Sequence, residues 1–147
     1  MTLVEVADPE PYLELEHGLA AEVVLQGSCV VTTRHGATRH VDKLVLDTGL
    51  GWALMAPEAG LGMDEVDDGA MTVLHTLGGP AGCFGGSVLL RLGAHWQARV
   101  PVVINRHSPD WLLGYPVLRH FDLLLRDAPH RPTPRLIGPR SGLLPVI

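Results

Sequence analysis

Short runs of β-branched and apolar residues follow one another along this sequence, and glycines or prolines separate them. The chain contains 17 glycines and 12 prolines, which leaves little room for long helices. Short runs bounded by turn formers are typical of strands. The sequence therefore predicts an all-β fold, a barrel or a sandwich. The expected strands are 13–16, 22–26, 29–34, 40–47, 52–57, 71–77, 87–92, 96–105 and 122–126.

The connections between these runs differ in character. His35–Ala37 fits a tight hairpin turn, the acidic segment 58–70 fits a surface loop, and the glycine-rich run Gly78–Gly86 fits the tip of a wide hairpin. Pro101 cannot donate a backbone hydrogen bond, so its strand is expected at an edge or a bulge. One short helix is expected over Pro116–Phe121, because proline fits the first helical position.

Chain length limits the number of domains, and net charge limits the class of partner. Its 147 residues, 46% of them hydrophobic, predict one domain with a real core. The expected arrangement is an arm at 1–11, a domain at 12–128 and a proline-rich tail at 129–147. The net charge is −5 and the eleven cations are scattered, which disfavours nucleic acid as a partner. Lys43 is the single lysine, which is typical of a GC-rich bacterial genome.

Targeting and redox features favour a cytoplasmic protein without a membrane contact. The segment 1–11 shows no basic and apolar leader, and no uncharged apolar stretch is long enough to span a membrane. Cys29 and Cys83 form no CxxC pair and are expected as reduced, half-buried thiols. The eight histidines form no HExxH or HxH pattern, so neither a metal nor another cofactor is expected.

The segment most informative for function is LVLDTG at Leu44–Gly49. A hydrophobic strand that ends in Asp47 exposes a carboxylate on a rigidly held backbone. Asp, Thr and Gly also form ordinary turns, so this tripeptide alone is weak evidence for a catalytic acid. Two further pieces add specificity: a hairpin with a glycine-rich tip at Met71–Leu92, and WLLG at Trp111–Gly114 ahead of the expected helix.

With these pieces in this order over residues 20–127, the chain resembles the retropepsin-like aspartic proteases. The family pattern is hydrophobic-hydrophobic-Asp-Thr-Gly, a flap hairpin, and hydrophobic-hydrophobic-Gly before a helix. The resemblance implies an acid-protease β-barrel and an endopeptidase in which two carboxylates share one proton and activate a water. Asp67–Ala70 follows Asp47 too closely and no hydrophobic strand precedes it, so it is expected as an acidic turn. The second carboxylate must then be Asp47 of a second copy, in a two-fold homodimer that cleaves a peptide or protein substrate.

The resemblance also implies roles for the neighbours of Asp47. Thr48 would hydrogen-bond across the dimer axis, and Gly49 would let the backbone approach the carboxylate. A supporting loop, which could equally be the end of a core strand, consists of Leu112, Leu113 and Gly114. The flap would be Leu77–Gly86, closing over a bound peptide. Its candidates for substrate contact are Leu77, Gly78, Gly79 and Phe84.

Two departures from the family pattern leave alternatives open. Leu50–Trp52 stands where a small residue and then Ser or Asp is usual, and Tyr115–Pro116 stands where Arg, Asn or Asp is usual. The missing polar groups would help to hold the catalytic carboxylate and the dimer interface. One alternative is the same fold as a dimeric peptide-binding module without catalysis. Another is an unrelated small β-barrel in which Asp-Thr-Gly is only a turn.

Overall fold

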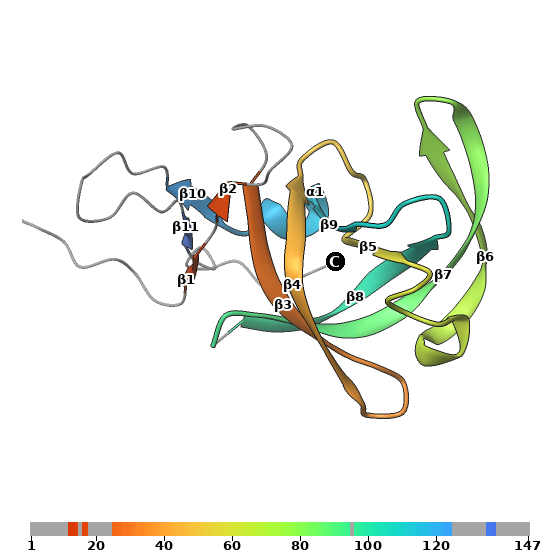
Figure 1. The fold of residues 1–147 in the computed structure, drawn as a ribbon, viewed down its shortest axis with the longest axis horizontal. Coiled ribbons are helices and arrows are strands. Elements are labelled where there is room, and N and C mark those ends of the chain that lie inside the picture. Colours follow the sequence, from red (N-terminus) through yellow and green to blue (C-terminus); the bar gives the residue numbers. More distant parts are fainter. Residues whose placement is uncertain (1–11, 15, 18–24, 95, 125–134, 138–147) are drawn as a thin grey trace, which may run out of the picture.

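A computed structural model describes residues 12–14, 16–17, 25–94, 96–124 and 135–137 (Figure 1). The strands are β1 (Tyr12–Glu14), β2 (Glu16–His17), β3 (Leu25–Thr32), β4 (Thr38–Asp47), β5 (Leu54–Pro57), β6 (Asp67–Thr76), β7 (Gly79–Leu92), β8 (Trp96–Asn105), β9 (Trp111–Gly114), β10 (Asp122–Leu124) and β11 (Arg135–Ile137). A 3-10 helix, η1, spans Met63–Glu65, and an α-helix, α1, spans Tyr115–Leu118. The predicted arm at 1–11 lies outside the described residues.

Six strands close into a barrel. Their order is β3-β4-β9-β5-β8-β7, and antiparallel pairing of β7 with β3 completes the ring. Two of the neighbouring pairs in the ring are parallel, β4 with β9 and β5 with β8. The other neighbouring pairs are antiparallel. β6 extends the sheet beyond β7, and β2 extends it beyond β3. The prediction of a β-barrel with one short helix is confirmed.

Two apolar clusters account for the burial pattern of the strands. The main cluster fills the barrel, and alternating residues of β7 and β8 point into it. Val102 and Val103 are both fully buried although their side chains point to opposite faces of β8, because a second cluster covers its other face. This second cluster, called the site cluster below, consists of Leu50, Met55, Leu74, Cys83 and Val103.

Several turns and strand ends follow the sequence prediction. Gly36 turns the β3–β4 hairpin with a φ of 83°, and the amide of Thr33 donates to the carbonyl of Ala37 at 2.8 Å. Pro101 has a strand neighbour on one side only, because β5 pairs with β8 from Val102 onward. Parts of the two strands expected at 22–26 and 29–34 belong to one strand, β3, which spans Leu25–Thr32 and has a register shift between Gly27 and Cys29.

The hairpin of β6 and β7 differs most from expectation, and Figure 1 shows it as the long green arm. The segment 58–70 is not one loop, because it contains η1 and the start of β6. The run Gly78–Gly86 is not a wide tip either: from Gly79 onward it lies in β7 and pairs with β6. The chain reverses at Leu77 and Gly78, and Gly79 adopts a φ of 105° that favours glycine.

A separate three-stranded sheet joins β10 and β11 from the C-terminal part of the described chain with β1 from its N-terminal part. α1 begins with a proline in its first turn, as expected, but ends at Leu118, earlier than the predicted Phe121. β11 lies between β1 and β10, so residues 135–137 of the segment expected as a tail form a strand. Neither helix of the described residues has the length and apolar character needed to cross a membrane.

Both cysteines are free and buried more deeply than expected, and burial raises the pKa of Cys29 from 9.0 to about 12. In the unfolded chain the Cys29 thiol ionises first, so unfolding releases its proton between these two pH values. The free energy of unfolding is therefore expected to fall by about 1.4 kcal/mol per pH unit in that window. Urea denaturation at pH 8 and pH 10.5 should show a smaller alkaline loss for Cys29→Ala than for wild type. Equal losses in the two proteins would contradict this assignment.

His120 is 3% exposed, and neither of its ring nitrogens has a hydrogen-bond partner among the residues that the structure describes. Burial of unpaired polar atoms destabilises the folded state. His120→Leu is therefore expected to raise the free energy of unfolding by about 1 kcal/mol. This corresponds to a rise in melting temperature of about 2–4 °C. Calorimetry should show no such gain for His40→Leu, a matched control at an exposed position.

Candidate active site

The two segments that most resemble a catalytic motif end side by side. β4 and β9 are parallel, and their register pairs Leu44 with Trp111 and Asp47 with Gly114. Parallel neighbours end at the same edge of a sheet, so the Asp-Thr-Gly segment and the WLLG segment reach one place. The structure thus brings Asp47 next to the glycine predicted to support it.

A tight turn follows Asp47 and orients its carboxylate. The amide of Gly49 donates to Oδ1 of Asp47 at 2.9 Å, and the amide of Leu50 donates to the Asp47 carbonyl at 3.2 Å. A Cβ at Gly49 would lie 3.3 Å from the same Oδ1, closer than most Cβ contacts. Asp47 is half-buried, and Thr48 and Gly49 are exposed. One carboxylate oxygen is thereby fixed by the backbone, while Oδ2 has no partner among the described residues.

The chain between Leu50 and Ala53 folds tightly over the end of β9. The amide of Gly114 donates to the Ala53 carbonyl at 2.9 Å, and the amide of Tyr115 donates to the Leu50 carbonyl at 3.0 Å. A Cβ at Gly114 would lie 1.7 Å from the Trp52 carbonyl oxygen, so only glycine fits there. These contacts fasten the segment 47–53, called the site loop below, to a strand of the barrel.

The site cluster links the site loop to the hairpin that was expected to be a flap. The loop contributes Leu50 to the cluster, and the hairpin contributes Leu74 and Cys83. The partly buried side chains that pack against the cluster are Trp52 and Leu112. The hairpin and the loop that carries Asp47 therefore share one apolar contact region.

Three of the four predicted flap residues lie together at the tip of the hairpin. The Leu77 side chain is fully exposed, at 112% of its reference area. Thr76 Oγ1 donates to the Gly79 carbonyl at 2.7 Å and accepts from the Gly78 amide at 3.2 Å, which closes the turn. Phe84 lies apart from these residues, because it packs against the main core.

Nothing in the sequence indicates the groove that lies beside Trp52. This groove has a volume of about 540 Å³ and runs over β6, β7 and β8. Arg99 and Asp67 form an ion pair near it at 2.5 Å. Eleven residues line the groove: Trp52, Asp68, Ala70, Met71, Thr72, Gly85, Gly86, Ser87, Arg99, Val100 and Pro101. The groove lies where the glycine-rich run pairs with β6, and no local sequence pattern indicates that pairing.

Asp47 takes part in no ion pair within the described residues. The ion pairs found within the described ranges are Arg39–Glu65 and Arg99–Asp67. No three His, Cys, Asp or Glu residues of the described chain converge as metal ligands would. The chemistry available at this loop is therefore that of a carboxylate next to an apolar cluster.

No protein-family model matches the chain, and no curated protein sequence matches it. Function is therefore inferred from the geometry of the site loop, β9 and the hairpin.

Proposed function

We propose that this protein is a retropepsin-like aspartic endopeptidase that acts as a homodimer, with Asp47 of each copy forming the catalytic pair. One observation carries the proposal: Asp47 and Gly114 end adjacent parallel strands, and the site loop is hydrogen-bonded across them. This places a half-buried carboxylate at the open end of a closed barrel. A carboxylate in an ordinary surface turn needs no such support from a second strand.

The catalytic step follows from two carboxylates that face one water across a two-fold axis. They share one proton, because two like charges so close do not both ionise. The ionised carboxylate takes a proton from the water, whose oxygen bonds to the peptide carbonyl carbon. The protonated carboxylate gives its proton to the carbonyl oxygen. The carboxylate that took the water's proton then gives it to the amide nitrogen, and the C–N bond breaks. A hydroxyl of the intermediate returns its proton to the other carboxylate, so the products are a carboxylic acid and an amine and the pair again holds one proton.

Substrate binding in this proposal uses the apolar surroundings of the site loop. An extended peptide would lie over the site loop and the β6–β7 hairpin, with apolar side chains against Trp52 and Leu112, the partly buried side chains that pack on the site cluster. The groove beside Trp52 provides further room along β7 and β8. The hairpin would exclude water from the reacting bond when it covers the peptide.

One observation favours a second candidate, a dimeric peptide-binding module without catalysis. Oδ2 of Asp47 has no partner in the described chain. Leu50 and Trp52, which stand where a polar residue is usual, pack into or against the site cluster. A carboxylate held by a single backbone amide could mark a binding site rather than a catalytic one.

Cleavage of a diverse peptide mixture tests the proposal. We expect products over part of the range from about pH 3.5 to 7, with a maximum at the pH where one proton is shared by the pair. Mass spectrometry of the products would also give the residues that flank the cut bond. Peptide binding without products at any pH would favour the second candidate.

A further inference from the structure

We propose that the groove beside Trp52 binds the side chain of an arginine in the peptide substrate. The inference deepens the proposed function, on which it rests, because it names the substrate class. These are peptides that carry an arginine at a fixed distance from the residue lying on the site cluster. The family pattern does not supply this inference, since Trp52 is one of the residues that depart from that pattern.

The groove continues the surface on which the peptide is proposed to lie. Successive residues of a strand point to opposite faces, so Cys83, Gly85 and Ser87 share one face of β7. Cys83 belongs to the site cluster, whereas Gly85 and Ser87 line the groove. At about 3.4 Å per residue, the groove begins about 7 Å beyond the site cluster. An extended peptide over both therefore places in the groove a side chain about two to four residues from the one on the site cluster.

Trp52 forms a wall of the groove, and small residues of β6 and β7 lie beneath it. A Cβ at Gly85 would lie 3.3 Å from Cη2 of Trp52, so the indole stands directly over this glycine. Trp52 is half-buried, because it packs on the site cluster and also lines the groove. The groove's volume of about 540 Å³ falls in the range of sites that hold small ligands, so a long side chain fits there.

The charges of the groove favour a cation. Arg99 lines the groove, but its guanidinium donates to the Asp67 carboxylate at 2.5 Å, so this positive charge is compensated. Asp68 also lines the groove and is exposed, and it forms no ion pair within the part of the chain that the structure describes. The uncompensated charge among the lining residues is therefore the Asp68 carboxylate.

Arginine is the cation that suits both Trp52 and Asp68. Its planar guanidinium stacks on an indole and can donate two parallel hydrogen bonds to one carboxylate. A lysine ammonium can contact the Asp68 carboxylate but has no planar face to stack on Trp52. An acidic side chain of a peptide would be repelled by Asp68. The groove thus selects for arginine by shape as well as by charge.

Binding of paired peptides to the full chain tests the inference. The probes are dye-labelled peptides of alternating valine and threonine that carry one arginine, which is moved along the peptide one position at a time. Each has a partner with citrulline, which keeps the shape of arginine without its charge. Fluorescence anisotropy should show about 10-fold tighter binding of the arginine peptide at one or more positions. This is the combined effect of a cation–π contact and an exposed ion pair.

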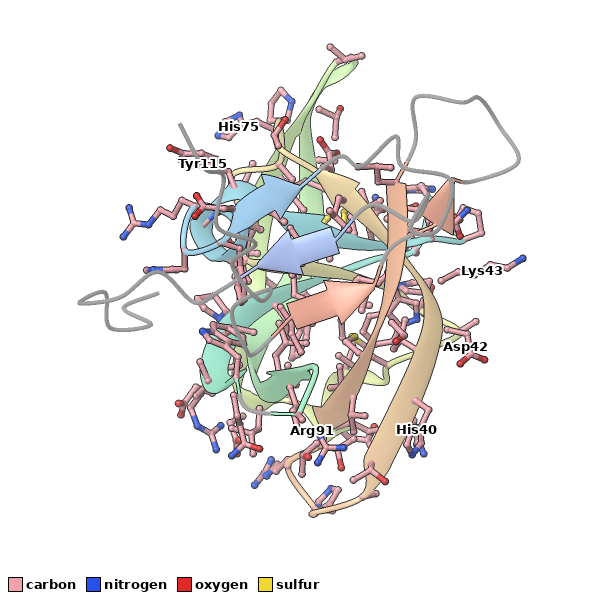
Figure 2. The ribbon with its side chains drawn as sticks, turned by 90° about the vertical axis from the view of Figure 1, so that its left-hand side faces the viewer. His40, Asp42, Lys43, His75, Arg91 and Tyr115 are labelled. Carbon is pink, nitrogen blue, oxygen red and sulfur yellow. The ribbon has the colours of Figure 1, made fainter. Side chains whose placement is uncertain are left out.

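Three variants connect the preference to the groove. Asp68→Asn should reduce the preference to about 3-fold or less, and asparagine tolerates the φ of 51° at this position. Arg99→Gln leaves Asp67 uncompensated and should tighten binding of the arginine peptide about 3-fold. Asp42→Asn is the matched control, because Asp42 is exposed on β4 outside the groove and points outward beside Lys43 in Figure 2. It should keep the wild-type preference.

The outcomes separate this inference from the proposed function. Equal binding of the arginine and citrulline peptides by wild type, or no binding of either, overturns the groove assignment whatever the cleavage assay shows. An undiminished preference in Asp68→Asn also overturns it. An Asp68-dependent preference without cleavage at any pH leaves the groove assignment standing and overturns the peptidase. Asp47-dependent cleavage without the preference does the reverse. Circular dichroism of Asp68→Asn distinguishes a lost contact from a lost fold.

Discussion

Asp47→Asn is expected to abolish peptide cleavage, lowering the rate by about 10³-fold or more, while the fold and the dimer persist. Asparagine has the shape of aspartate but cannot take a proton from water. Its carbonyl oxygen can still accept the hydrogen bond that the Gly49 amide donates to Oδ1, so the site loop keeps its conformation. The measurement compares product formation from one peptide mixture by both proteins, with sedimentation of each.

Asp42→Asn is the matched control for this experiment. Asp42 is an exposed carboxylate on β4, the strand that also carries Asp47, so the same chemical change is made on the same element. We expect it to cleave like wild type. Loss of activity in both variants would point to a general charge effect. Full activity in Asp47→Asn would overturn the peptidase proposal.

Mixing wild type with Asp47→Asn tests whether the two carboxylates come from different copies. A mixed dimer holds one carboxylate and should be inactive. After random exchange at equal concentrations, about a quarter of the dimers are wild type on both sides. The activity per wild-type chain should then fall to about half. Unchanged activity after confirmed exchange would mean that each copy works alone.

The sequence predicted the strand that ends at Asp47, whereas Leu112–Gly114 was expected as a supporting loop or, equally, as the end of a core strand, and the structure has it in β9. Hydrophobic runs that stop at Asp47 and at Gly114 mark strand ends by themselves, and the structure pairs these two ends. Their parallel alignment involves residues far apart in the chain, and no local pattern specifies that. The family resemblance implied only that Leu112–Gly114 supports the Asp47 loop, and it did not predict that the two strands are parallel.

The glycine-rich hairpin shows why local propensity failed elsewhere. Glycine favours turns, so Gly78–Gly86 was expected to be a tip. In the folded chain β6 pairs with this segment residue by residue, from Thr76 with Gly79 to Met71 with Phe84. Cross-strand hydrogen bonds and the burial of Cys83 in the site cluster outweigh the local preference. Pairing between strands is a tertiary property, so the groove beside Trp52 could not be predicted either.

Gly114→Ala is expected to lower the free energy of unfolding by about 3 kcal/mol or more, a large effect for one methyl group. The added Cβ would lie 1.7 Å from the Trp52 carbonyl oxygen and 2.9 Å from that of Leu50. Both are backbone atoms, so no side chain can rotate away to make room. The site loop must move off β9, which breaks the hydrogen bonds from Gly114 to Ala53 and from Tyr115 to Leu50. Urea denaturation gives the loss directly.

Gly51→Ala is the matched control, because it also replaces a glycine by alanine but adds a Cβ that meets no other atom. Gly51 belongs to the same site loop, is exposed, and has no atom within 4 Å of an added Cβ. Its replacement is expected to change the free energy of unfolding by less than about 1 kcal/mol. If Gly114→Ala were as mild as Gly51→Ala, the loop would not be held against β9. A destabilised but folded Gly114→Ala protein should also cleave more slowly, because Asp47 shares its loop with the displaced carbonyls.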